Sequence, residues 1–91
     1  MNIKLHDGNI DLPDVLYLDQ LAQLDLSMIN KLSTLKDEES LNGDMINWLI
    51  NLFKVLGVER RFSMQDLVDF KKDDQLVNWF NLLFSGFQPS N

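Results

Sequence analysis

The sequence predicts a single domain over residues 1–91 that is mainly α: four to five short helices in a small bundle, preceded by a short β-hairpin or an extended arm. Hydrophobic residues make up 45% of the 91 residues and charged residues 24%, a balance typical of a folded globular chain. Apolar residues also recur at helical spacing over most of the chain. Ser, Asp and Gly residues interrupt this spacing where helices are expected to begin and end.

The first twelve residues alternate apolar and polar side chains on both sides of a turn signal, as β-hairpins do. Either Asp7-Gly8 or Gly8-Asn9 can form the turn, and the sequence leaves both open. Because an isolated hairpin is only marginally stable in water, its apolar side chains must pack on the helices. These side chains are Ile3, Leu5, Ile10 and Leu12.

Two helices are expected after the hairpin. Pro13 suits the first position of a helix, and the leucine spacing beyond it predicts a helix over about residues 14–24. Ser27 can cap a second helix, and the apolar stripe of this helix predicts an end near Lys36. A polar loop over residues 37–42 follows, and Gly43 continues it.

A third helix is expected to carry Trp48. Asp44 can accept a hydrogen bond from the first turn and so cap its start. Gly57 can adopt the left-handed conformation that commonly follows the end of a helix. The sequence therefore predicts that this helix lies between Asp44 and Gly57.

The last helical region begins at Met64, because Ser63 and Asp66 have the spacing of a capping box. The pattern does not decide whether a helix over residues 64–70 stops or continues into the helix of residues 74–84, and we favour a break. Ser85 and the glycine after it close the last helix, so we expect residues 85–91 to form a mobile tail.

A short pattern occurs twice in the two most apolar helices. Ile46-Asn47-Trp48-Leu49 matches Val77-Asn78-Trp79-Phe80, which lies 31 residues later (79 minus 48). The match is explained either by a duplicated helix pair or by chance in a chain rich in Leu, Asn and Asp.

Both of these helices have unusually wide apolar faces. At about 100° per residue the apolar arc of each is about 220°, roughly twice what an ordinary surface helix needs. Two interpretations follow: the helices form the centre of the domain, or part of each face contacts a protein partner. For the second interpretation, the predicted partner-binding residues are Trp48, Phe53, Trp79, Phe80, Phe84 and Phe87.

The sequence contains no recognisable catalytic or cofactor-binding arrangement. The chain has no cysteine, and its single histidine, His6, lacks a second metal ligand at a recognised spacing. The four glycines are isolated, so no phosphate-binding loop is expected, and the serines lack a neighbouring base. We therefore predict that the protein is not an enzyme and needs no metal or cofactor.

The formal net charge of −6 opposes binding to nucleic acid. No apolar run is long enough for a membrane span and no signal peptide is recognisable, so we expect a cytoplasmic protein. Half of the eight basic residues lie in Arg60-Arg61 and Lys71-Lys72, on either side of residues 62–70. They either solvate this segment or orient an acidic partner.

The chain resembles the small tail-assembly chaperones of long-tailed bacteriophages. The residues that carry this resemblance are Ile3-Lys4-Leu5, Asp7-Gly8 and Leu12-Pro13, followed by a Leu-rich helix ending in Gly at 52–57, the acidic segment 66–70 and the apolar helix 76–84. The resemblance implies a non-catalytic role: covering apolar parts of the tape-measure protein, helping to recruit tail-tube subunits, and leaving before the tail is complete.

We therefore expect a protein-binding module whose partner is an apolar helical segment of a client. Two alternatives remain open. One is a small acidic inhibitor of a host protein, of the kind that phages use. The other is a structural subunit that associates with itself into a homo-oligomer.

Overall fold

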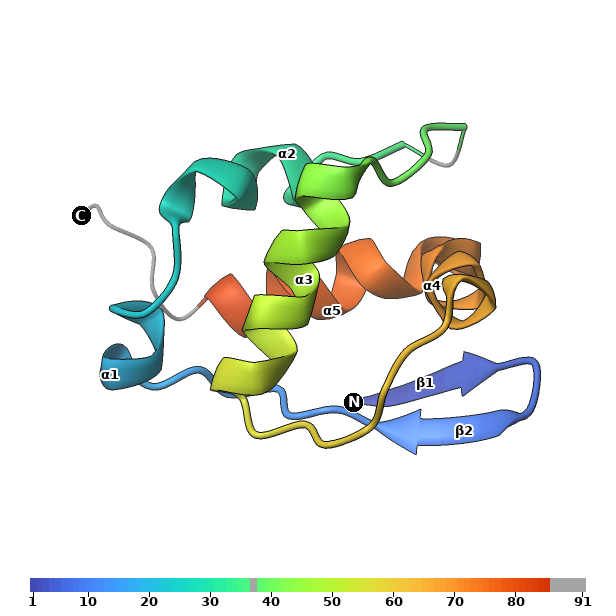
Figure 1. The fold of residues 1–91 in the computed structure, drawn as a ribbon, viewed down its shortest axis with the longest axis horizontal. Helices are drawn as coiled ribbons and strands as arrows, with labels where there is room; N and C mark the ends of the chain where they lie inside the picture. Colours follow the sequence, from blue (N-terminus) through green and yellow to red (C-terminus); the bar gives the residue numbers. More distant parts are fainter. Residues whose placement is uncertain (37, 86–91) are drawn as a thin grey trace.

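The computed structural model describes residues 1–36 and 38–85. Its element order confirms the prediction of a mainly α-helical fold with an N-terminal hairpin (Figure 1). The predicted mobile tail, residues 85–91, lies outside the described residues except for Ser85. Among the described residues, none of the helices has both the length and the apolarity that a membrane crossing requires.

The hairpin consists of strands β1 (Asn2–Leu5) and β2 (Gly8–Asp11), which pair antiparallel with Ile3 opposite Ile10. Both expected turns are wrong, because His6 and Asp7 form the turn and Gly8 follows it with φ of +138°. A tertiary contact accounts for the shift. The backbone N–H of His6 donates to Asp69 Oδ2 at 2.8 Å and so holds the turn against a distant helix.

The predicted helix over residues 14–24 is wrong, because residues 12–17 are extended and helix α1 covers only Leu18–Leu21. The extended segment buries Leu12 and Leu16. It also places the carbonyl of Pro13 2.8 Å from Nε1 of Trp79, which donates a hydrogen bond to it. These contacts outweigh the local preference for a helix.

The next helical segment is shorter than expected and has a different cap. A 3-10 turn, η1 (Leu26–Met28), leads into α2 (Ile29–Ser33), which ends three residues before Lys36. Asp25, not Ser27, caps this segment: Asp25 Oδ1 accepts a hydrogen bond from the Ser27 N–H at 3.0 Å.

Helix α3 (Gly43–Val55) begins before Asp44, so the predicted cap is wrong by two residues. Asn42 caps the helix by accepting a hydrogen bond from the Met45 N–H at 2.9 Å. The predicted end at Gly57 is confirmed. Gly57 has φ of +79°, and the N–H of Val58 donates back to the carbonyl of Phe53 at 2.9 Å.

Helix α4 (Met64–Lys71) starts at the predicted capping box, in which Ser63 and Asp66 each accept a hydrogen bond from the other's backbone N–H. The favoured break is also confirmed. The short turn η2 (Lys72–Asp74) contains Asp73 and Asp74 with φ of 55° and 56°, values that an α-helix does not allow. Helix α5 (Gln75–Phe84) follows.

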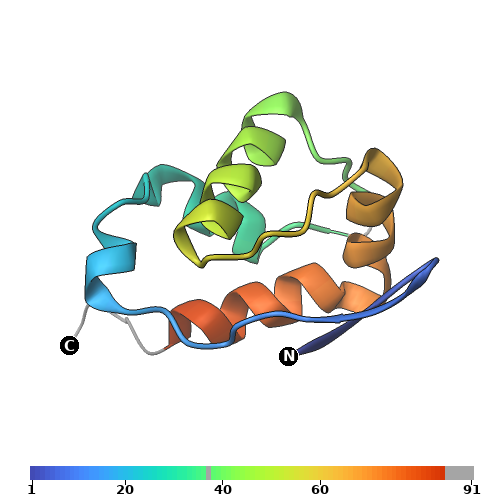
Figure 2. The same cartoon turned by 60° about the horizontal axis from the view of Figure 1, so that its bottom comes forward.

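Helix α5 lies at the centre of the fold. Helix α3 crosses it, and the extended segment after β2 runs beside it (Figures 1 and 2). Helix α2 and helix α4 also pack on α5, and α4 in turn packs on β1. A duplication would make α2 and α3 one helix pair and α4 and α5 the other. Helix α2 packs mainly on α5, which is outside its pair, whereas α4 packs on α5, which is inside its pair. The two pairs therefore do not pack alike.

Candidate partner-binding surface

Four of the six predicted partner-binding residues are buried in the core, and this corrects the expectation that they form a contact surface. Their exposed fractions are 7% for Trp48, 4% for Phe53 and 0% for Trp79 and Phe80. Phe84 is half-buried. The sixth residue, Phe87, lies outside the described residues.

The aromatic rings are buried because they pack against one another between α3 and α5. Trp48 lies 5.5 Å from Phe80, and Phe53 lies 5.9 Å from Trp79, both measured between ring centroids. Each indole also has a hydrogen-bond partner. Nε1 of Trp48 donates to the carbonyl of Asp25 at 2.7 Å, as Trp79 does to Pro13. The wide apolar faces are therefore used mainly inside the fold.

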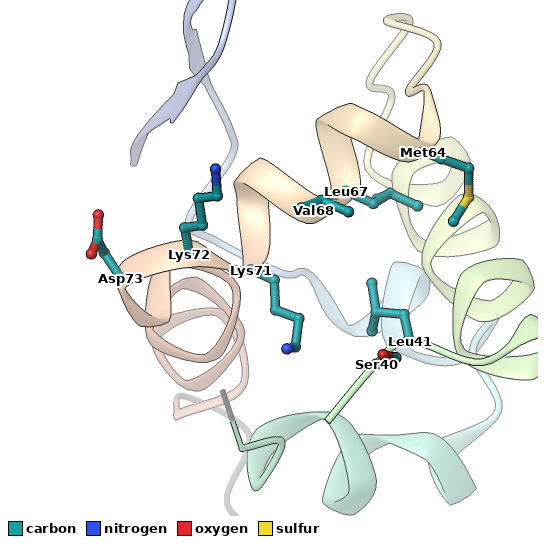
Figure 3. Close-up of a pocket in the computed structure, with 8 residues that line it drawn as sticks. All are labelled: Ser40, Leu41, Met64, Leu67, Val68, Lys71, Lys72 and Asp73. Carbon is teal, nitrogen blue, oxygen red and sulfur yellow. The ribbon is translucent and has the colours of Figure 1, made fainter. Parts of the chain in front are cut away.

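An exposed apolar surface remains beside α4, in a groove with a volume of about 550 Å³. We call it the α4 groove. Met64 and Val68 are 61% and 49% exposed, whereas Leu67 is buried at its base. The residues that line the groove are Ser40, Leu41, Met64, Leu67, Val68, Lys71, Lys72 and Asp73 (Figure 3).

Helical geometry explains why one side of α4 lines this groove. Met64, Leu67, Val68 and Lys71 lie at positions i, i+3, i+4 and i+7, which share a helix face. The capping box at Ser63 fixes where the helix starts and therefore which residues face the groove. Leu41, in the loop before α3, forms the opposite wall (Figure 3). This spacing was visible in the sequence, but the sequence could not show that the face stays uncovered.

Charged residues of both signs line the groove at the C-terminal end of α4. Lys71 extends across the groove towards Ser40 and Leu41, and Lys72 projects outward at the rim (Figure 3). Nζ of Lys72 lies 3.4 Å from Asp69 Oδ1, with 64% of the lysine side chain exposed. Two basic residues, Lys71 and Lys72, and one acidic residue, Asp73, thus lie at one end of an apolar groove.

A cluster of charged residues on another side of α4 attaches the hairpin to it. His6 Nδ1 lies 2.5 Å from Asp69 Oδ2, and Arg60 Nη2 lies 3.4 Å from Asp7 and 3.3 Å from Asp66. Burial raises the pKa of Asp69, but hydrogen bonds from the His6 backbone and ring outweigh it and lower this pKa to about 2. The backbone N–H of Ser63 likewise holds the pKa of Asp66 below its ordinary value.

This cluster brings together the residue types that can bind a metal ion. One ligand atom from each of His6, Asp7 and Asp66 lies within 4.8 Å of the other two. The guanidinium of Arg60 already supplies positive charge to both carboxylates, and the Asp66 carboxylate also caps α4. We therefore interpret the cluster as a clamp between the hairpin and α4. Sequence reasoning missed it because its members are up to 63 residues apart.

No protein-family model, curated protein or solved structure matches this chain. The resemblance to tail-assembly chaperones therefore stays a prediction, and a functional proposal has to be argued from the surface itself. The α4 groove is the feature that suits such an argument. It combines exposed apolar side chains, a concave shape and a charged end.

Proposed function

We propose that this protein is a non-catalytic, cytoplasmic protein-binding module that binds an apolar segment of a client in the α4 groove. In its more specific form, the proposal is that the chain acts as a tail-assembly chaperone of a long-tailed bacteriophage and transiently covers apolar parts of the tape-measure protein. The observation that carries the proposal is the exposure of Met64 and Val68 over a concave apolar surface.

The driving force is the burial of apolar area, at about 25 cal/mol for each Å² removed from water. Part of this gain is offset by the entropy lost when two molecules associate. A groove of limited size therefore gives reversible binding, which suits a chaperone that must leave its client. The capping box at Ser63 satisfies the start of α4, so the apolar face is already formed and little further ordering is needed.

The test is co-expression with a tape-measure protein encoded in the same genomic neighbourhood. We expect the wild-type protein to keep this client in the soluble fraction, and Val68→Gln to lose most of that effect. Val15→Gln is the matched control, because Val15 is 53% exposed but lies outside the groove. Equal loss in both variants would argue against the groove, and a neighbourhood without tail genes would argue against the chaperone role.

A further inference from the structure

We propose that the hairpin is a strap that holds a strained bend between α4 and α5, and that release of the hairpin lets this bend relax. The bend is η2, where Asp73 and Asp74 have φ of 55° and 56°. This inference does not rest on the proposed function, because it concerns the motion of α4 in the protein alone. It is therefore tested without a client.

The backbone at the bend is strained. A residue other than glycine with a positive φ is uncommon, and two such residues follow each other here. Aspartate tolerates this conformation better than most residues do, which explains why the bend falls at the aspartate pair, but glycine alone adopts it freely. Strain of this kind persists only where surrounding contacts hold the backbone in place.

Contacts from the hairpin hold the backbone on both sides of the bend, and the hairpin lies beside the junction of α4 and α5 (Figure 2). After the bend, Gln75 Oε1 accepts a hydrogen bond from the Lys4 N–H at 2.7 Å, and Gln75 Nε2 donates to the Lys4 carbonyl at 3.1 Å. The same Nε2 donates to the Asp69 carbonyl, in the last turn of α4, at 3.0 Å. Before the bend, the Asp69 side chain accepts a hydrogen bond from the His6 N–H at 2.8 Å.

These contacts couple the position of the hairpin to the bend. While the hairpin is docked, its hydrogen bonds offset the strain at Asp73 and Asp74. Once it leaves α4, residues 72–74 can return to ordinary backbone angles, and α4 then changes its direction relative to α5. Lys72 and Asp73 also line the α4 groove, so the same motion changes the shape of this groove. By linkage, release of the hairpin favours opening of the bend as much as opening favours release.

Native-state hydrogen exchange measures both events in the intact protein. The N–H of His6, which donates to Asp69, reports release of the hairpin. The N–H groups of Lys72 and Gln75 donate to the carbonyls of Asp69 and Lys72 and so report the bend. The N–H of Leu52, in the buried part of α3, reports global unfolding.

The first test compares Asp73→Val with Asp73→Gly. Both variants lose the same exposed carboxylate, but a β-branched valine increases the strain at positive φ and glycine relieves it. We expect the protection of the His6 N–H to be about tenfold lower in Asp73→Val than in Asp73→Gly, with a much smaller change at Leu52. The matched control is the same pair of substitutions at Asp44, an exposed position of α3 without a positive φ, which should leave the protection of His6 equal.

The second test runs from the hairpin to the bend. His6→Ala removes the ring that contacts Asp69, so the protection of the Lys72 and Gln75 N–H groups should fall about fivefold. Asn9→Ala changes an exposed residue of β2 and is the control, in which this protection should stay as in wild type. Circular dichroism confirms that each variant is folded. If Asp73→Val does not fold, Asp73→Ala takes its place in the first comparison.

Three outcomes would overturn the inference. Equal protection of His6 in the two Asp73 variants would mean that strain at the bend does not reach the hairpin. An equal fall at His6 and Leu52 would mean that the bend opens only with global unfolding. Unchanged protection of Lys72 and Gln75 in His6→Ala would mean that the hairpin does not hold the bend. None of these outcomes bears on the proposed function, which the co-expression test decides separately.

Discussion

The aromatic core between α3 and α5 and the α4 groove show that the most apolar helices do not provide the most exposed apolar surface. Helices α3 and α5 have the widest apolar faces, yet both tryptophans are at least 93% buried (100 minus the 7% exposure of Trp48). Helix α4 mixes apolar and charged residues, yet Met64 and Val68 are about half exposed or more. The arrangement of the elements, more than the composition of each helix, decides which apolar residues are available to a partner.

The difference has a structural cause. Helix α5 is central, so α2, α3, α4 and the extended segment after β2 all cover it. Helix α4 lies at the edge, where β1 and α5 pack on it and a loop forms the far wall of its groove. We therefore expect substitutions in the core to change stability, and substitutions in the groove to change binding.

The largest expected effect is that of Trp79→Ala in the core. Removing this fully buried ring should lower the free energy of unfolding by about 3–5 kcal/mol, because it leaves a cavity among packed rings. Urea denaturation followed by circular dichroism measures the change. If the variant does not fold, Trp79→Phe keeps an aromatic ring but leaves the Pro13 carbonyl without its donor, at a cost of about 1–3 kcal/mol. A loss below 1 kcal/mol for Trp79→Ala would contradict the assignment of this ring to the core.

Local signals predicted parts of the fold correctly. The capping box at Ser63, the left-handed Gly57 and the break between α4 and α5 depend on residues close together in the sequence. Each involves hydrogen bonds or backbone angles within one turn, and these are determined largely by residue type. The hairpin was predicted for the same reason, although its turn is His6-Asp7 and neither of the two turns that the sequence left open.

Predictions failed where distant contacts compete with local preference. The segment from Pro13 has a helical pattern but stays extended, because its carbonyl binds Trp79 66 residues away. Distant contacts also explain why the aromatic residues predicted to bind a partner are mostly buried. The sequence showed how wide the apolar faces of α3 and α5 are, but not that they face each other. It also contained the spacing from Met64 to Lys71 without showing that this face remains open.

A smaller effect is expected from Asp69→Asn, which tests the clamp that holds the hairpin on α4. The pKa of Asp69 is lowered from 3.8 to about 2, so its ionised form stabilises the fold above pH 3.8 and this contribution is lost as the pH falls through about 2. The variant should therefore have a lower urea midpoint than wild type at pH 6. The two midpoints should converge towards pH 2.

The matched control for the clamp is Asp14→Asn, the same change at an exposed position of the extended segment. It should follow wild type across the whole pH range. If Asp69→Asn also follows wild type, the contacts between His6 and Asp69 contribute nothing to stability. The hairpin would then be held mainly by its apolar residues and by the hydrogen bonds of Gln75 to Lys4.

The smallest effect on stability is expected from Val68→Gln in the α4 groove. Val68 is 49% exposed, so its substitution should change the free energy of unfolding by no more than about 0.5 kcal/mol. Binding to a partner should be weakened strongly, because the new amide loses its water when the partner covers it. Chemical denaturation measures the effect on stability, and the solubility of the co-expressed client measures the effect on binding. A stability loss as large as that of Trp79→Ala would mean that α4 belongs to the closed core, and the contrast between the two regions would disappear.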